Sequence, residues 1–285
     1  MLEMLINPKK AEKRPWELFF VGAFYATISI LLVNWIFSQD AVLAKHGGIL
    51  IVTFTVMLSI PFVYYTIRNE EEKITARSGS MGLIIEHQKA LIALMWLFIG
   101  FLVAFSFWYM VLPTTQSFQA QIETYCMINQ PGSVENCVNQ YSVTDSASPT
   151  GAFSSGERFF LIFTNNIYVL FFTLLFSLIF GAGVIFILAW NATVIAAAIG
   201  IFTDSSVTGI PLGLFRFMLH GIPEIAAYFI VAIAGGIVSF AVIKHEMGTP
   251  KFWEVLHDSI NLIILAVVVL FVAALMEVFL TPMFF

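Results

Sequence analysis

Six polar residues lie within or beside long apolar stretches and are therefore candidate functional residues: Asn165, Asn166, Asn191, Arg216, His220 and Glu224. Ionisable and amide side chains are costly in lipid, so each is a candidate for function. Together they could line a polar cavity, and His220 with Glu224 could serve hydrolysis. One histidine, one carboxylate and neutral amides make a weak zinc site. We therefore predict no metal site, no cofactor and no catalytic residue.

The segment 203–223 is predicted to contain a helix break or a re-entrant segment. Pro211 would open a short helix that ends near His220, and Pro223 would stand in the first turn of the next span. Glu224 would then lie where the helix dipole favours its charge, and His220 would be close enough to hydrogen-bond it. On an unbroken helix, Arg216, His220 and Glu224 would instead share one face, because they are four residues apart.

A purely structural role also fits these residues. Asparagines in membrane helices often only bridge neighbouring helices, at roughly 0.6 kcal/mol each. A histidine and a carboxylate at a helix break can also satisfy freed backbone groups. Glu277, near the end of the last apolar run, is expected to reach water.

The composition indicates the environment of these residues. Of 285 residues, 59% are hydrophobic and 11% are charged, and mean hydropathy is +0.91. A soluble domain carries roughly 25% charged residues, so this chain is expected to be solvated mainly by lipid. No basic stripe is present that could neutralise phosphates, which disfavours nucleic acid as a partner.

Apolar runs of about 20 residues predict membrane-spanning helices. Five single runs qualify: 16–37, 49–67, 90–112, 222–243 and 260–279. The run 159–202 is twice as long, and we expect a helical hairpin that turns at Gly181-Ala182-Gly183. The predicted fold is an all-α polytopic bundle of about seven spans in the plasma membrane.

The distribution of Lys and Arg predicts the orientation, since these residues favour cytoplasmic loops. One set of loops carries Lys9, Lys10, Lys13, Arg14, Arg68, Lys73, Arg77, Lys89, Lys244 and Lys251. The opposite set carries Lys45, Arg158 and Arg216. The N-terminus is therefore expected in the cytoplasm and the C-terminus outside.

The polar segment 113–158 is expected on the outer side, and it contains both cysteines of the chain, Cys126 and Cys137. Pro131-Gly132 can turn the chain between them. A disulfide there would contribute roughly 2–3 kcal/mol. The alternative is two free thiols in a reducing compartment.

The polar motifs of the apolar runs, taken in chain order, resemble the signature of the stage II sporulation protein M family. Its members show an Asn-Asn pair, then Asn-Gly in the next span, then Pro-His-Gly-x-x-Glu. Here the pair is Asn165-Asn166, Asn191 precedes Ala192, and Leu219 stands where the family has proline. The resemblance covers about 90–246. It leaves 1–89, with two spans and a cytoplasmic loop, and 247–285, with the last span, as additions.

The resemblance implies a membrane scaffold of the cell envelope that recruits or positions partner proteins. Small-residue surfaces would also permit a homodimer. A transporter or channel is the alternative, with a polar cavity lined by Asn165, Asn166, Asn191, His220 and Glu224. A membrane-embedded hydrolase that uses His220 and Glu224 ranks third.

Overall fold

The computed structural model is helical throughout the residues that it describes, which are 14–40, 42–74, 80–112, 117–129, 132–142, 155–180, 184–244 and 247–284. Within these ranges there is no strand. The predicted all-α class is therefore confirmed.

Seven helices in the described ranges are long and apolar enough to cross a membrane, as predicted. They are α2 (Glu17–Phe37), α3 (Gly47–Ile74), α4 (Ser80–Val111), α7 (Ser155–Phe180), α8 (Val184–Phe202), α9 (Ile210–Ile243) and α10 (Pro250–Leu275). The hairpin between α7 and α8 is confirmed, although its expected turn at 181–183 lies outside the described residues.

Six shorter elements complete the described fold. Two are α-helices, α5 (Gln119–Asn129) and α6 (Val134–Ser142). Three are 3-10 turns: η2 (Leu43–His46), η3 (Val207–Gly209) and η5 (Thr281–Met283). Directly after α10, η4 (Met276–Leu280) is a π-helix.

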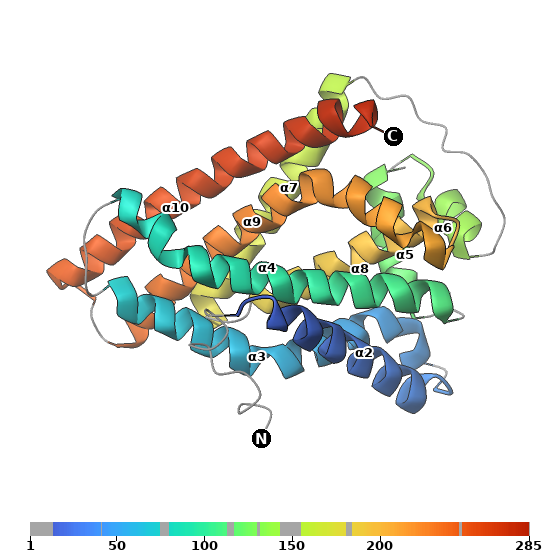
Figure 1. Cartoon of the computed structure of the whole chain (residues 1–285), viewed down its shortest axis with the longest axis horizontal. Coiled ribbons are helices and arrows are strands. Elements are labelled where there is room, and N and C mark those ends of the chain that lie inside the picture. Colours follow the sequence, from blue (N-terminus) through green and yellow to red (C-terminus); the bar gives the residue numbers. More distant parts are fainter. Residues whose placement is uncertain are drawn as a thin grey trace.

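The expected helix break at Pro223 is wrong. The chain turns at 203–209, where Asp204 and Ser205 have positive φ angles of 49° and 55°, and α9 then continues through Pro223. Pro223 removes one backbone donor and displaces the Leu219 carbonyl. The other backbone groups have no water to hydrogen-bond with in the apolar interior, so they keep their bonds within the helix. Helix α9 therefore stays continuous, and it is curved (Figure 1). Pro211 does lie in the first turn, as predicted.

Helix α9 forms the centre of the bundle and α7 lies at its periphery. Of the most apolar window of each helix, 83% is buried in α9 and 22% in α7. Close packing between the two depends on Gly235, where an added Cβ would lie 2.9 Å from the Ser177 Cβ and 3.1 Å from the Leu174 carbonyl. The outward face of α7 is therefore exposed to lipid, whereas its inner face touches α9.

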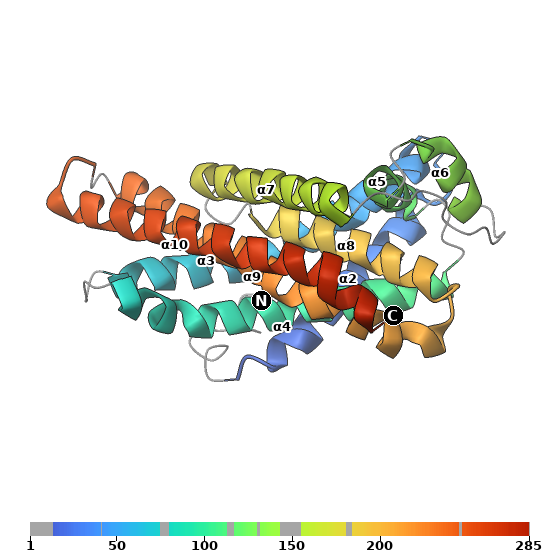
Figure 2. The ribbon, with the colours of Figure 1, turned by 90° about the horizontal axis from the view of Figure 1, so that it is seen from above.

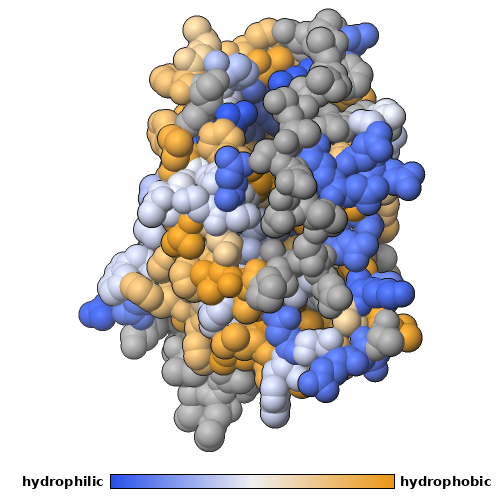
Figure 3. Space-filling view, turned by 90° about the vertical axis from the view of Figure 1, so that its right-hand side faces the viewer, coloured by the Kyte–Doolittle hydropathy of each residue, from blue (hydrophilic) through white to orange (hydrophobic). Residues whose placement is uncertain are grey.

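The connections gather at the two ends of the bundle. In Figures 1 and 2, α3 ends and α4 begins at the left-hand end, where α9 also gives way to α10. The short helices α5 and α6 lie at the right-hand end, which the C-terminal end of the chain also approaches. Figure 3 looks onto this right-hand end and shows many hydrophilic residues there. This arrangement agrees with the alternation of loops that the apolar runs predict.

Candidate functional site

Glu224 lies where α7 and α9 meet, and two hydrogen-bond donors hold its carboxylate. Tyr228, one turn further along α9, donates from its hydroxyl to Glu224 Oε1 at 2.9 Å. The side chain of Asn166, on α7, donates to the same carboxylate. Tyr228 is fully buried and Asn166 is 5% exposed. Donors from two helices therefore hold one half-buried carboxyl group where α7 meets α9.

Asn165 extends this arrangement toward the lipid-facing side of α7. Its Nδ2 atom donates to Asn166 Oδ1 at 3.4 Å. Consecutive residues of an α-helix point about 100° apart, so one asparagine faces α9 and the other faces outward. We call the series Asn165, Asn166, Glu224 and Tyr228 the polar chain. It joins the surface of α7 to the centre of the molecule.

His220 has a different partner from the one predicted. Its Nδ1 atom lies 3.1 Å from Thr281 Oγ1, and Thr281 Oγ1 donates its hydrogen to the Met276 carbonyl at 3.1 Å. A hydroxyl has only one hydrogen to donate, so the threonine accepts from His220 and the histidine carries its proton on Nδ1. The expected bond from His220 to Glu224 is not formed, although both residues lie on the continuous α9, because His220 Nδ1 pairs with Thr281 and the Glu224 carboxyl pairs with Tyr228 and Asn166.

Glu277 joins the same region, which sequence reasoning missed. It is half-buried in the π-helix η4 and lies within electrostatic range of Glu224 and Tyr228. The Glu277 side chain was expected to reach water, with no link to the other polar residues. Single-turn π-helices occur frequently at functional sites, because the extra residue reorients side chains. No local sequence pattern predicts the π-helix, although Thr281-Pro282 directly after it indicates the end of regular helix.

Two arginines place positive charge on one side of this region. The Arg216 guanidinium lies 4.4 Å from the centroid of the Phe202 ring, a cation–π contact. Arg158 is exposed near the start of α7. Both arginines lie within electrostatic range of His220, and Arg158 also lies within range of Glu277. The region therefore combines two cations, two carboxyl groups and a histidine.

Asn191 stands apart from the other predicted residues. Its Nδ2 atom donates to the Ile187 carbonyl at 2.7 Å, a bond within α8. Among the described residues, Asn165, Asn166 and Glu224 are thus brought together by hydrogen bonds, while Arg216 and His220 lie nearby on α9 with other partners.

The donor set determines what chemistry is available. In the described part of the chain, no three His, Cys, Asp or Glu side chains lie close enough to hold a metal ion. The side chains of the polar chain are amide, phenol and carboxyl groups, which can hydrogen-bond to polar groups.

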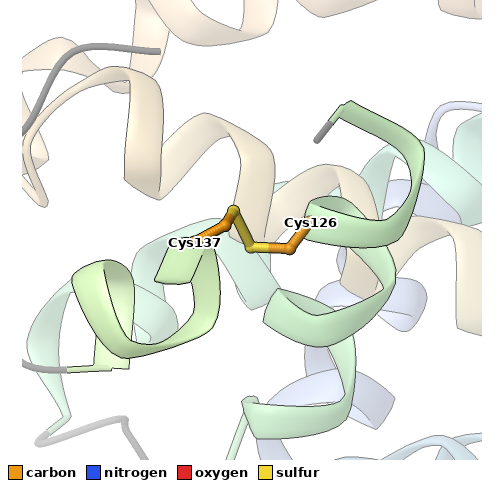
Figure 4. The surroundings of a disulfide bond; sticks show 2 residues. All are labelled: Cys126 and Cys137. Carbon is orange, nitrogen blue, oxygen red and sulfur yellow. A yellow bond between two sulfur atoms is a disulfide. The ribbon is translucent and has the colours of Figure 1, made fainter. Parts of the chain in front are cut away.

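A second feature lies at the right-hand end of the bundle in Figure 1, where α5 and α6 form what we call the cap. The sulfur atoms of Cys126 and Cys137 are 2.02 Å apart, at disulfide distance, and their Cα atoms are 5.8 Å apart. Figure 4 shows this bond joining the two helices. The predicted disulfide is confirmed, whereas the helices of the cap were not foreseen.

Buried side chains anchor the cap to the spans. Gln121 of α5 is fully buried, and its Nε2 atom donates to the Gly48 carbonyl and to Thr193 Oγ1, both at 3.2 Å. Ser117, just before α5, donates to Asn34 Oδ1 at 2.9 Å. The cap is therefore tied to α2, α3 and α8.

The cap also lies within electrostatic range of the two arginines. The rings of Tyr125 and Tyr141 meet edge to face at 6.1 Å between centroids. Burial raises the pKa of Tyr125, and Tyr141 raises it further, whereas the charges of Arg216 and Arg158 lower it. Tyr125 therefore interacts electrostatically with both arginines.

Comparison with known proteins shows which family the chain is related to. The family profile described as "Stage II sporulation protein M" matches residues 52–282, a wider segment than the expected 90–246. The uncharacterised protein MJ0793 of Methanocaldococcus jannaschii is 32% identical over 126 residues, covering 42% of this chain and 69% of that protein. No solved structure matches. The chain belongs to the stage II sporulation protein M family.

Proposed function

We propose that this membrane protein is a scaffold of the cell envelope that positions partner proteins through its cap. The anchoring of the cap carries this proposal. A disulfide joins α5 to α6, and Gln121 and Ser117 bond to three membrane-spanning helices or their starts. A surface held in one conformation loses little entropy when a partner binds.

Two further observations support this role. The cap exposes apolar side chains that a partner could cover, with Met127 62% and Ile128 42% exposed. The Lys and Arg distribution predicts that the cap lies on the outer side, where envelope proteins act. The family resemblance implies the same kind of role.

Site-specific photocrosslinking in native membranes tests the scaffold. A photoreactive phenylalanine analogue at Met127 should give discrete protein adducts. The same analogue at Trp253 is the matched control, because Trp253 is 61% exposed at the start of α10, at the opposite end of the bundle. Adducts should weaken in the Cys126→Ser/Cys137→Ser variant. Identical adducts from both positions, or none from Met127, would contradict the scaffold.

A transporter or channel is the second candidate, and the polar chain favours it. A carboxylate held by Asn166 and Tyr228, with Glu277 within electrostatic range, is an arrangement that could exchange a cation or proton across the bundle. In liposomes, Glu224→Gln should abolish sodium or proton flux. Asn191→Leu should preserve the flux, because Asn191 does not belong to the polar chain. Equal fluxes in the wild type and Glu224→Gln would remove this candidate.

A further inference from the structure

A groove of about 760 Å³ follows the outward face of α7. Its described lining comes from this helix alone, between Gly156 and Tyr168, at three- and four-residue spacing. Phe160, Leu161 and Tyr168 expose 69%, 49% and 61% of their surfaces along it. Because the groove lies within a candidate membrane span, Gly156–Leu178, its occupant comes from the bilayer.

Two polar atoms interrupt this apolar wall. Within the part of the chain that the structure describes, neither Thr164 Oγ1 nor Asn165 Oδ1 has a hydrogen-bond partner. Thr173, on the same helix, instead donates to the Val169 carbonyl at 2.8 Å, the usual arrangement for a threonine in a membrane helix. Polar groups left unpaired in hydrocarbon are costly, so a ligand that hydrogen-bonds to them is favoured.

The depth of these atoms selects the kind of lipid. Thr164 and Asn165 lie eight and nine residues beyond Gly156, which is about 12–14 Å along the helix axis. A phosphate headgroup stays at the membrane surface, whereas a hydroxyl on a neutral lipid can lie deeper. The only charged residue in the described lining is Glu157, at the mouth, so this lining offers no cation to an anionic headgroup.

We propose that this groove binds a neutral lipid that carries a hydroxyl group, such as a diacylglycerol. The acyl chain packs on Phe160, Leu161 and Tyr168. The hydroxyl donates to Asn165 Oδ1 and exchanges hydrogen bonds with Thr164. Asn165 also donates to Asn166, so the bound hydroxyl becomes the outer end of the polar chain that leads to Glu224. This site goes beyond the scaffold role and does not depend on it.

Photolabelling of the full chain in nanodiscs tests the site. The first probe is a diacylglycerol with a diazirine on one acyl chain, and the second is the same molecule with its hydroxyl acetylated. We expect the first probe to label α7 near Phe160 or Tyr168. The acetylated probe should label about fivefold less, the change expected when one net hydrogen bond is lost.

Variants separate recognition from general contact with lipid. Asn165→Leu and the nearly isosteric Thr164→Val should each lower labelling by the free-hydroxyl probe and leave labelling by the acetylated probe unchanged. Phe172→Leu is the matched control, because Phe172 is 48% exposed on α7 outside the groove. Equal labelling by both probes, or undiminished labelling of a thermally stable Thr164→Val protein, would overturn the proposal.

Discussion

Tyr228 donates its hydroxyl hydrogen to Glu224 Oε1 across one turn of α9, at 2.9 Å, and the tyrosine is completely buried. A buried phenol needs a hydrogen-bond partner, and donors stabilise a half-buried carboxylate, so each residue satisfies the other. Asn166 adds a donor from α7. The pair is therefore both a local bond within α9 and part of the contact between two spans.

Removing the phenol tests this relationship. Tyr228→Phe keeps the ring and deletes the donor to Glu224, so we expect the free energy of unfolding to fall by about 1–3 kcal/mol. Thermal denaturation in detergent, followed by circular dichroism, measures the change. Tyr168→Phe is the control, because Tyr168 is 61% exposed on α7. Equal effects of the two substitutions would contradict the assignment.

Asn166 and Tyr228 should be energetically coupled, because both donate to one carboxylate. We expect the double variant Asn166→Leu/Tyr228→Phe to depart from the sum of the single variants by about 0.5–3 kcal/mol. Pairing Tyr228→Phe with Asn191→Leu gives the comparison cycle, since Asn191 bonds within α8. Strict additivity in the first cycle would show that the two donors do not share Glu224.

The disulfide should stabilise the cap. Cys126→Ser/Cys137→Ser opens the loop between α5 and α6, and the expected loss is roughly 2–3 kcal/mol by chain entropy. Limited proteolysis should then cut this segment faster, while the membrane spans stay protected. A reducing agent should reproduce the effect in the wild type and change nothing in the double variant. Unaltered proteolysis of the double variant would mean that Gln121 and Ser117 suffice to hold the cap.

Gly48 should be intolerant of a side chain because of Gln121. A Cβ at position 48 would overlap Gln121 Oε1, which is buried and has no hydrogen-bond partner among the described residues. Gly48→Ala should therefore destabilise the protein by about 1–3 kcal/mol through overpacking. Gln121→Ala should therefore cost less stability in the Gly48→Ala background than in the wild type, where it removes two hydrogen bonds. Equal costs in the two backgrounds would contradict the steric explanation.

The sequence predicted the membrane fold well because each span is a long apolar run that needs no tertiary information. The asparagine pair and Glu224 were predicted to matter from their cost in lipid alone, and the structure joins them by hydrogen bonds. The expected break at Pro223 failed because one proline removes only one backbone donor, and the remaining hydrogen bonds keep α9 helical through it. Glu277 was missed because a π-helix and a partner on another helix leave no local pattern. The cap helices have only 11 and 9 residues, so a search for apolar runs of about 20 residues could not find them.

The length of α9 has a consequence for the surrounding bilayer. Its 34 residues extend over about 51 Å, whereas the hydrocarbon core is about 30 Å thick. Such hydrophobic mismatch is relieved by tilting, bending or local thickening of the membrane. Because Pro223 weakens the backbone hydrogen bonds near Glu224, bending is favoured next to the polar chain. Acyl-chain length in the host membrane should therefore tune the geometry around Glu224.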